Sequence, residues 1–313
     1  MPALLTHNYF GEDVLERCPW LDSTFDTPEL REVFLLGNQG PDPFFYTLLS
    51  RHIVKNKKFG SLMHREKVAE TIEAFRRLAN SCPDYSGCVL RAYLLGFICH
   101  FTLDSIMHPF VYAQQYALCD AGARGLDRRD GSTVHGQIEA TLDMMLLRRR
   151  RGRGIREYDY TRDVLKVDED ALLLLDAAYE ALAHEVYAID LPAGSFSRGV
   201  HDMRLTIRLL YSPRGIKRWL IGRVERLFRR HSFAQAMSPR NDVGVSCDFD
   251  NREQNVWKHP FVEDFTDGLS WASFDELYAE ALDAAPNNIT ALLDKKPALT
   301  ITNTLNFQGA PCP

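Results

Sequence analysis

The sequence predicts an all-α protein, a multi-helix fold that continues into a largely helical C-terminal region. Apolar residues recur at helical intervals along most of the 313 residues, and the alternating patterns typical of strands are scarce. The stretch 88–111 is apolar nearly all round, as expected of a central helix. We expect one core region at residues 1–160 and a second region at 161–313 that packs on it.

The predicted helices follow in order from the spacing of apolar residues. In the stretch 61–79, for example, five apolar residues fall on one stripe: Leu62, Val68, Ile72, Phe75 and Leu78. The predicted helices are 12–18, 29–36, 44–53, 61–79, 88–111, 134–147, 169–187, 195–211, 214–230 and 274–284.

Two segments interrupt this helical pattern. The chain is expected to break between Gly37 and Pro43, because Gly permits a positive φ and Pro stops helix propagation. Residues 234–269 lose the periodicity and are rich in Asp, Asn and Pro. That length is unusual for a structureless connection, so we expect this segment to wrap the helical body or to cover a site.

The bulk composition is that of an ordinary globular protein. Hydrophobic residues make up 45% and charged residues 25% of the chain, which excludes global disorder and fibrous classes. The net charge of −5 neither predicts nor forbids a nucleic-acid partner. Seven cysteines without a CxxC pair indicate reduced thiols, and the N-terminus lacks the features of a secretory signal. No apolar run reaches the roughly 18 residues of a membrane span, so we predict a cytoplasmic protein without a transmembrane helix.

The strongest chemical signal is a row of three potential metal ligands. His100, Asp104 and His108 recur at intervals of four, and each such step on a helix rotates by about 40° and rises by about 6 Å. The three side chains therefore share one face of an apolar helix, where polar groups are costly to bury unless they are paired or bound to metal. A single buried His with a hydrogen-bonded Asp is common, but three ligands on one face favour a metal, and we predict zinc.

Five further residues extend this ligand set. His135 and Glu139 are also four residues apart and can chelate one ion, although such a pair is frequently only a surface ion pair. His7, Asp42 and His64 stand near breaks or helix starts, and each of them alone is more often structural than a ligand. The remaining histidines show no comparable grouping.

Taken in order, these residues resemble the zinc-dependent phospholipase C family, whose helical fold is shared with the single-strand-specific nucleases. The resemblance covers the first half of the chain, through the segments LMHREK, GFICHFTLDSIMHP and HGQIE. It implies a phospholipase C/nuclease-like fold in which residues 1–160 form a metal-binding catalytic core. The implied zinc ligands are His7, Asp42, His64, His100, Asp104, His108, His135 and Glu139.

The resemblance also implies how the ligands divide among the ions. Each of two zinc ions has its own group: Asp42, His64, His100 and Asp104 for one, and His108, His135 and Glu139 for the other. Asp42 is then the candidate general base or water-orienting group. A third ion would share Asp104 and take His7 with the mature N-terminus, but this chain begins Met1-Pro2 where secreted members expose a Trp. Two zinc ions are therefore expected, and the third is left open.

This ligand set predicts a zinc-dependent hydrolase of phosphoric diesters that acts on a phospholipid or another phosphodiester. Zinc lowers the pKa of bound water toward about 7, which supplies a hydroxide nucleophile at neutral pH. Two alternatives stay open. A single-strand nuclease would need base-stacking aromatic residues and a basic strand path. A non-catalytic interaction or regulatory protein would keep the metal but block its open positions, for example with residues 234–269.

The segment 214–230 has the pattern of a basic amphipathic helix. Its apolar stripe either packs on the domain core, with the cations solvated, or lies peripherally on an anionic membrane surface. Nucleic acid is the less favoured partner. The stripe consists of Ile216, Trp219, Leu220, Val224, Leu227 and Phe228.

Two smaller features bear on the substrate. The basic run 148–156 either has a functional role or complements the dipole at a helix C-terminus. Phe44, Phe45 and Tyr46 follow Asp42, and they either line a pocket for a choline-like cation or belong to the core. The sequence makes no prediction of the physiological substrate or the oligomeric state.

Overall fold

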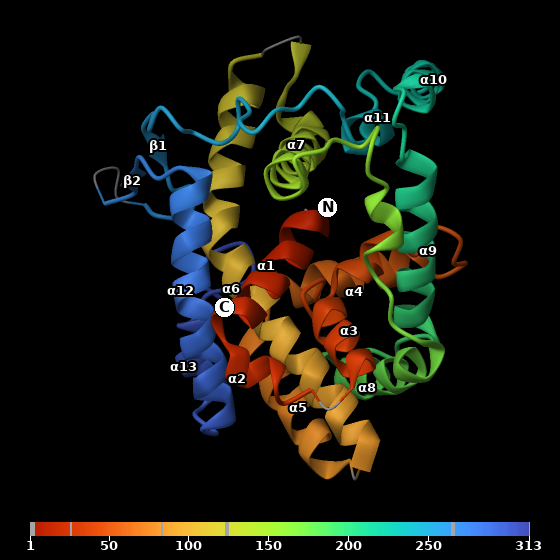
Figure 1. Cartoon of the computed structure of the whole chain (residues 1–313), viewed down its shortest axis with the longest axis vertical. Helices are drawn as coiled ribbons and strands as arrows, with labels where there is room; N and C mark the ends of the chain where they lie inside the picture. Colours follow the sequence, from red (N-terminus) through yellow and green to blue (C-terminus); the bar gives the residue numbers. More distant parts are fainter. Residues whose placement is uncertain (1–3, 26, 83, 123–124, 264–266, 313) are drawn as a thin grey trace. The chain divides into compact units, whose positions relative to one another are not determined.

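The computed structural model describes residues 4–25, 27–82, 84–122, 125–263 and 267–312. Regular structure in these ranges is almost entirely helical, as Figure 1 shows, and the predicted all-α class is confirmed. The α-helices are α1 (Leu4–Arg17), α2 (Pro19–Asp22), α3 (Pro28–Gly37), α4 (Ile53–Met63), α5 (Val68–Ser81), α6 (Asp84–Asp120), α7 (Gly131–Arg151), α8 (Glu169–Tyr187), α9 (Ser195–Leu210), α10 (Ile216–Glu225), α11 (Phe233–Met237), α12 (Phe274–Leu293) and α13 (Ala298–Thr302). The shorter elements are the 3-10 helices η1 (Asp42–Tyr46), η3 (Arg128–Asp130) and η4 (Tyr160–Arg162), and the antiparallel strands β1 (Trp257–Lys258) and β2 (Leu269–Ser270).

The chain forms two compact units that alternate along the sequence. Unit A contains the described residues of segments 7–106, 165–204 and 280–313, and unit B contains those of segments 1–6, 107–164 and 205–279. Four helices, α1, α6, α9 and α12, therefore contribute residues to both units. The division at residue 160 that the sequence suggests stays a prediction.

Aromatic side chains build the core of unit A. The Tyr179 ring stacks on Phe196 with centroids 4.5 Å apart, and Phe44 and Phe75 meet Tyr179 edge-on at 5.0 and 5.3 Å. Tyr93 of α6 contacts three of these rings. The first half of α6 is thus a core helix of unit A, as its apolar sequence predicts, and Phe44 belongs to this core rather than to a pocket.

Helices α3 and α6 touch backbone to backbone in unit A. A Cβ on Gly96 would lie 2.0 Å from the Phe34 carbonyl oxygen, and one on Gly37 would lie 2.2 Å from the Tyr93 carbonyl oxygen. Only residues without a side chain permit this approach. The crossing holds the turn that follows α3 against the middle of α6.

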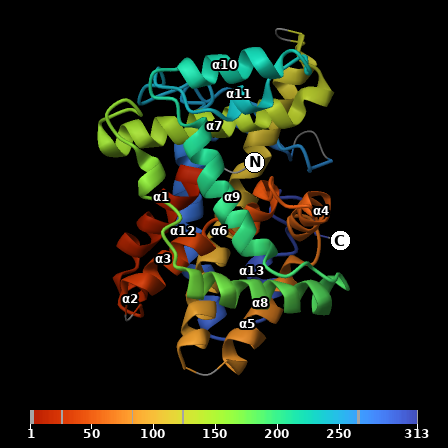
Figure 2. The same ribbon diagram turned by 90° about the vertical axis from the view of Figure 1, so that its right-hand side faces the viewer.

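Unit B is built on α7 and the second half of α6. Figure 2 shows α11 lying between α7 and α10, and α11 contacts both helices. The segment 234–269, apart from the end of α11 and the two short strands, runs without regular structure over these helices, with residues 264–266 outside the described residues. Gln114 of α6 donates to the Phe249 carbonyl at 3.2 Å, and Arg149 of α7 donates to the Val245 carbonyl at 2.6 Å.

The predicted helix 214–230 is shorter in the structure, where α10 ends at Glu225, and several other helices differ in their ends. Two predictions differ from the structure by more than that. The predicted helix 44–53 is wrong. Only the short helix η1 forms, and it ends at Thr47, whose φ of −65° and ψ of 51° lie outside the helical region and whose hydroxyl bonds the Phe44 carbonyl at 3.2 Å. The predicted helix 61–79 is two helices, α4 and α5, with a break at which Lys67 takes a φ of 55°. The sequence of α4 gave little periodic signal because its buried face includes Asn56 and Gly60, which are not apolar side chains.

Helix α6 meets the length and composition expected of a membrane span. In its most apolar window, however, 83% of the residues are buried inside the protein. Such burial is typical of a core helix, and no other helix in the described ranges passes the same test. The cytoplasmic location stays a prediction.

Candidate metal centre

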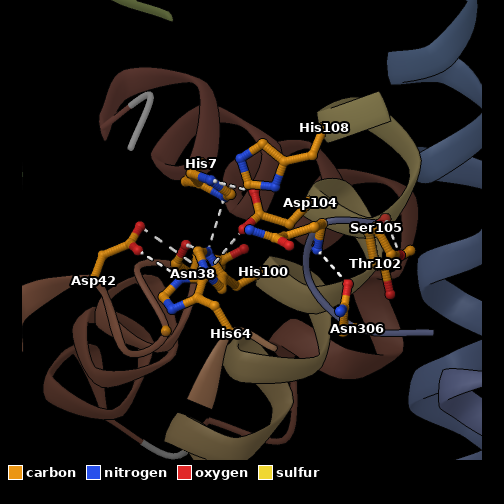
Figure 3. Close-up of polar contacts among 12 residues, drawn as sticks. His7, Asn38, Asp42, His64, His100, Thr102, Asp104, Ser105, His108 and Asn306 are labelled. Carbon is orange, nitrogen blue, oxygen red and sulfur yellow. Dashed lines mark hydrogen bonds and ion pairs between the residues drawn. The ribbon is translucent and has the colours of Figure 1, made fainter. Parts of the chain in front are cut away.

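Five predicted ligands meet in unit A, and we call them cluster A: His7, Asp42, His64, His100 and Asp104. They come from α1, the start of η1, the residue after α4 and one face of α6. Figure 3 shows these side chains pointing toward one another. The closest contacts are His7 Nε2 to Asp104 Oδ1 at 3.1 Å, His64 Nε2 to Asp42 Oδ1 at 3.0 Å and His100 Nε2 to Asp104 Oδ2 at 3.3 Å.

The turn after α3 delivers Asp42 to this cluster. Gly40 has a φ of 48°, and a Cβ there would lie 2.3 Å from His100 Cδ2, so a larger residue would strike the imidazole. Tyr93 fixes the same turn by donating from its hydroxyl to the Gly40 carbonyl at 2.8 Å. The breaker segment predicted between Gly37 and Pro43 is therefore a wall of the site.

Cluster A is buried in the core of unit A. Each of its residues is less than one tenth exposed, and His100 is completely buried. Burial lowers the pKa of His100 to about 4, although the charge of Asp104 opposes that shift. At neutral pH this imidazole is therefore uncharged, and it does not balance the carboxyl groups of Asp42 and Asp104 beside it.

The hydrogen bonds behind two rings decide which nitrogen carries the proton. His64 Nδ1 lies 2.7 Å from the Gly60 carbonyl oxygen, and His100 Nδ1 lies 3.1 Å from the Asn38 carbonyl oxygen. A carbonyl oxygen only accepts, so both Nδ1 atoms are the protonated ones. In the uncharged His100 ring, Nε2 then carries the lone pair, and in both residues Nε2 is the nitrogen turned into the site.

Both Nε2 atoms are directed at carboxylate oxygens. His64 Nε2 faces Asp42 and His100 Nε2 faces Asp104, at the distances given above. Within the described chain, Asp42 Oδ2 and His100 Nε2 have no hydrogen-bond partner. Electron-rich atoms that face one another in a buried site need a cation between them, and nitrogen and carboxylate donors are the set that zinc prefers.

Ligand atoms in cluster A also meet the spacing of a metal site. One atom each from His7, Asp42 and His100 lies within 4.8 Å of the others, and the same holds for His64, His100 and Asp104. The residues present therefore fit zinc.

Three further predicted ligands meet in unit B and form cluster B: His108, His135 and Glu139. His135 Nε2 lies 3.2 Å and His108 Nε2 lies 3.7 Å from Glu139 Oε1, and all three ligand atoms meet the same 4.8 Å spacing. The pair on α7 is buried rather than a surface ion pair. Burial lowers the pKa of His135, although the charge of Glu139 opposes that shift. Burial also opposes ionisation of Glu139, but nearby positive charge keeps the pKa of this carboxyl below its usual range.

Gln115 holds His135 in the same orientation that carbonyls impose in cluster A. His135 Nδ1 lies 2.9 Å from Gln115 Oε1, so the imidazole donates there and turns Nε2 toward Glu139. The Tyr112 ring packs on His135 at 4.9 Å and on Phe261 at 5.7 Å. Segment 234–269 thus contributes an aromatic wall, through Phe261, beside cluster B.

Asp143 fixes the first turn of α1 in unit B. Its carboxylate accepts hydrogen bonds from the Leu5 amide at 3.0 Å and from the Thr6 amide and hydroxyl, both at 2.8 Å. Burial raises the pKa of this carboxyl to about 6, although the amide and hydroxyl donors oppose the shift. Asp143 is therefore neither solvated nor bound to the cluster, and it serves as an anchor for the start of α1.

The C-terminal tail completes cluster A. The Phe307 amide donates to the His64 carbonyl at 3.2 Å, and the Phe307 ring contacts the rings of His64 and His100 at 5.1 and 5.3 Å. Phe307 is completely buried. A residue more than 200 positions from His100 in sequence thus forms part of the apolar surroundings of the ligands.

The structure brings all eight predicted ligands into the two clusters. Three neighbours were not predicted. Asn38 lies in the breaker turn, and Gln115 follows His108 by seven residues on α6, so both carried a positional signal. Phe307 carried none, because no local pattern links the tail to the ligands.

Comparison with known proteins bears on the same residues. A family model described as zinc dependent phospholipase C matches residues 6–189. No curated protein and no solved structure matched the chain. The matched region is more than half of the sequence and contains every residue of clusters A and B. The chain therefore belongs to the zinc-dependent phospholipase C family.

Proposed function

We propose that this protein is a zinc-dependent hydrolase of phosphoric diesters. The observation that carries the proposal is the common orientation of His64, His100 and His135, in which Nδ1 donates to an oxygen and Nε2 faces a carboxylate. Metal-bound histidines are held in this way by the groups around them. Family membership supports the reaction class. Bound zinc supplies Lewis acidity, which acidifies water and stabilises negative charge on a phosphoryl group.

The residues have distinct roles in this proposal. Cluster A holds zinc through nitrogen and carboxylate donors, and cluster B holds a second ion in the same way. Asp42 is the base: its Oδ1 is 3.0 Å from His64, while Oδ2 has no hydrogen-bond partner among the described residues and is the atom we assign to take a proton from the attacking water. Burial of Asp42 excludes bulk water from that transfer.

For the substrate we propose a phospholipid. The support is the family description, which names a phospholipase C. The rival substrate is single-stranded nucleic acid. Its bases would stack on the aromatic rings of Tyr112 and Phe261, which lie beside cluster B. One assay series with both substrates separates them.

The test combines metal content with hydrolysis. Zinc-reconstituted wild type is compared with Asp104→Asn, in which one carboxylate contacted by both His7 and His100 is neutralised. Asp176→Asn is the matched control, because Asp176 is a buried carboxylate of unit A that accepts from the Phe196 and Ser197 amides. Release of a phosphorylated head group from phosphatidylcholine and of nucleotides from single-stranded DNA is measured for each protein.

We expect zinc in the wild type and the control, with hydrolysis of phosphatidylcholine. Asp104→Asn should lose both zinc and at least about 100-fold of the rate, since a catalytic metal contributes several kcal/mol. Hydrolysis of DNA alone would establish the nuclease. Zinc without hydrolysis of either substrate would indicate a non-catalytic metal protein, and wild type that retains no zinc after reconstitution would refute the proposal.

A further inference from the structure

Helix α10 and the turn after it expose the apolar stripe that the sequence pattern of 214–230 defines. Ile216, Leu227 and Phe228 are 61%, 76% and 84% exposed, and Trp219, Leu220 and Val224 are about half exposed or more. The stripe therefore does not pack on the core of unit B, which was one of the two interpretations of the sequence. Figures 1 and 2 both show α10 on the far side of α11 from α7.

The opposite face of α10 is the one that packs. Gly222 is buried and lies close to Gln235: a Cβ at position 222 would be 2.4 Å from Gln235 Cδ. Glu225 accepts hydrogen bonds from the Ser232 hydroxyl at 2.7 Å and the Ala234 amide at 2.8 Å, and Arg218 donates to the Ser238 carbonyl at 3.3 Å. Polar contacts thus fix the helix in an orientation that turns its apolar side outward.

The exposed stripe is bordered by positive charge. Between residues 214 and 230 the sequence holds seven Lys or Arg residues and one acidic residue, Glu225. The Arg223 guanidinium lies over the Trp219 ring at 5.1 Å from its centroid, and Lys217 is exposed on the flank of the stripe. An apolar face with cations at its borders is the arrangement of helices that lie in a membrane interface.

We infer that α10 and the turn after it dock this protein on an anionic lipid surface. The apolar side chains would enter the boundary between head groups and acyl chains, while exposed cations such as Lys217 and Arg223 contact anionic head groups. A second copy of this chain fits less well, because a symmetric contact would bring two strongly cationic faces together. Nucleic acid would match the charge but would leave the apolar stripe in water.

This docking goes beyond the proposed hydrolysis, because α10 contains no residue of either cluster. Binding to lipid can be measured without turnover. The two proposals therefore succeed or fail separately.

The experiment is co-sedimentation of the zinc-reconstituted protein with vesicles. One set contains phosphatidylcholine, and the other contains phosphatidylcholine mixed with an equal amount of phosphatidylglycerol. Leu227→Ser/Phe228→Ser removes two exposed apolar groups, and Lys217→Gln/Arg223→Gln removes two cations. Matched controls change exposed residues of unit A: Leu173→Ser/Leu299→Ser for the apolar pair and Arg198→Gln/Lys295→Gln for the charged pair.

We expect binding to the anionic vesicles. Leu227→Ser/Phe228→Ser should weaken it at least about tenfold, since burial of each large apolar side chain favours insertion, and Lys217→Gln/Arg223→Gln should weaken it clearly. The controls and the hydrolysis-deficient Asp104→Asn should bind like wild type. Bromine-labelled acyl chains should quench fluorescence in wild type more than in Trp219→Phe. Equal binding of wild type and Leu227→Ser/Phe228→Ser would overturn the inference. It would also be overturned if wild type does not bind vesicles but forms a dimer, and Leu227→Ser/Phe228→Ser is a monomer.

Discussion

At the scale of single residues, the oxygen behind each imidazole decides what the ring can bind. In His64 and His100 that oxygen is a backbone carbonyl, and in His135 it is the side-chain oxygen of Gln115. A donor bond at Nδ1 fixes both the tautomer and the direction of Nε2. The carbonyls cannot be removed by mutation, but Gln115 can, so it offers a direct test of this orientation.

We predict that Gln115→Leu lowers zinc affinity at cluster B by roughly 10- to 100-fold, the usual effect of losing such an outer hydrogen bond. Gln115→Glu should keep most of the affinity, because it retains an acceptor for His135 Nδ1. Zinc titration against a competing chelator measures both. Gln114→Leu is the control, since Gln114 bonds the Phe249 carbonyl instead. Unchanged affinity in Gln115→Leu would show that His135 does not depend on this contact.

At the scale of elements, the site depends on how closely α3 and α6 cross. The contact at Gly37 and Gly96 sets the position of the turn that carries Asn38 and Asp42. Asp42 and His100 belong to different elements, and their atoms approach to 4.0 Å only because this crossing has no side chains in it. A change in the crossing should therefore reach the ligands.

The variant Gly96→Ala tests this dependence. Its Cβ would lie 2.0 Å from the Phe34 carbonyl oxygen, so the helices must separate. We expect a loss of about 1 to 3 kcal/mol in the free energy of unfolding, as for other overpacked contacts, together with weaker zinc binding at cluster A. Urea unfolding of the protein after metal removal by a chelator measures the stability, and zinc titration measures the affinity of cluster A. Gly244→Ala should change neither, because a Cβ there meets only ordinary contacts. If Gly96→Ala is destabilised but binds zinc as tightly as wild type, zinc binding at cluster A does not depend on the close crossing of α3 and α6.

At the scale of the whole molecule, each unit contains one cluster of buried ionisable ligands. Buried carboxylates without enough positive charge destabilise the folded chain, and a bound cation relieves that cost. Metal binding should therefore contribute to the stability of both unit A and unit B, in addition to any role in chemistry.

We predict that removing zinc with a chelator lowers the melting temperature and that zinc restores it. Free zinc at 100 times the dissociation constant would stabilise the folded protein by about 2.7 kcal/mol per site. Differential scanning calorimetry with and without zinc measures the change. Asp104→Asn/His135→Ala, which alters a ligand in each cluster, should lose most of this response. An identical melting temperature for chelated and zinc-loaded wild type would contradict the prediction.

Helices with strong local signals were predicted well. The predicted helix 169–187 is α8, because Asp168 caps its first turn by accepting from the Ala171 amide and apolar residues repeat along one face. The predicted helix 44–53 failed, because the backbone leaves the helical region at Thr47, whose hydroxyl bonds the Phe44 carbonyl. Local chemistry was sufficient in the first case and misread in the second.

By itself, the sequence determined the helical class, the identity of eight candidate ligands and the spacing of four that aligns His100 with Asp104 and His135 with Glu139, since a helix converts that spacing into a shared face. Only the tertiary structure decided the rest. It directed the imidazole nitrogens through oxygens from other elements, placed Phe307 beneath cluster A and turned the apolar side of α10 outward. These outcomes depend on contacts between residues far apart in the chain, and the apolar stripe of 214–230 did not by itself decide whether it would be covered.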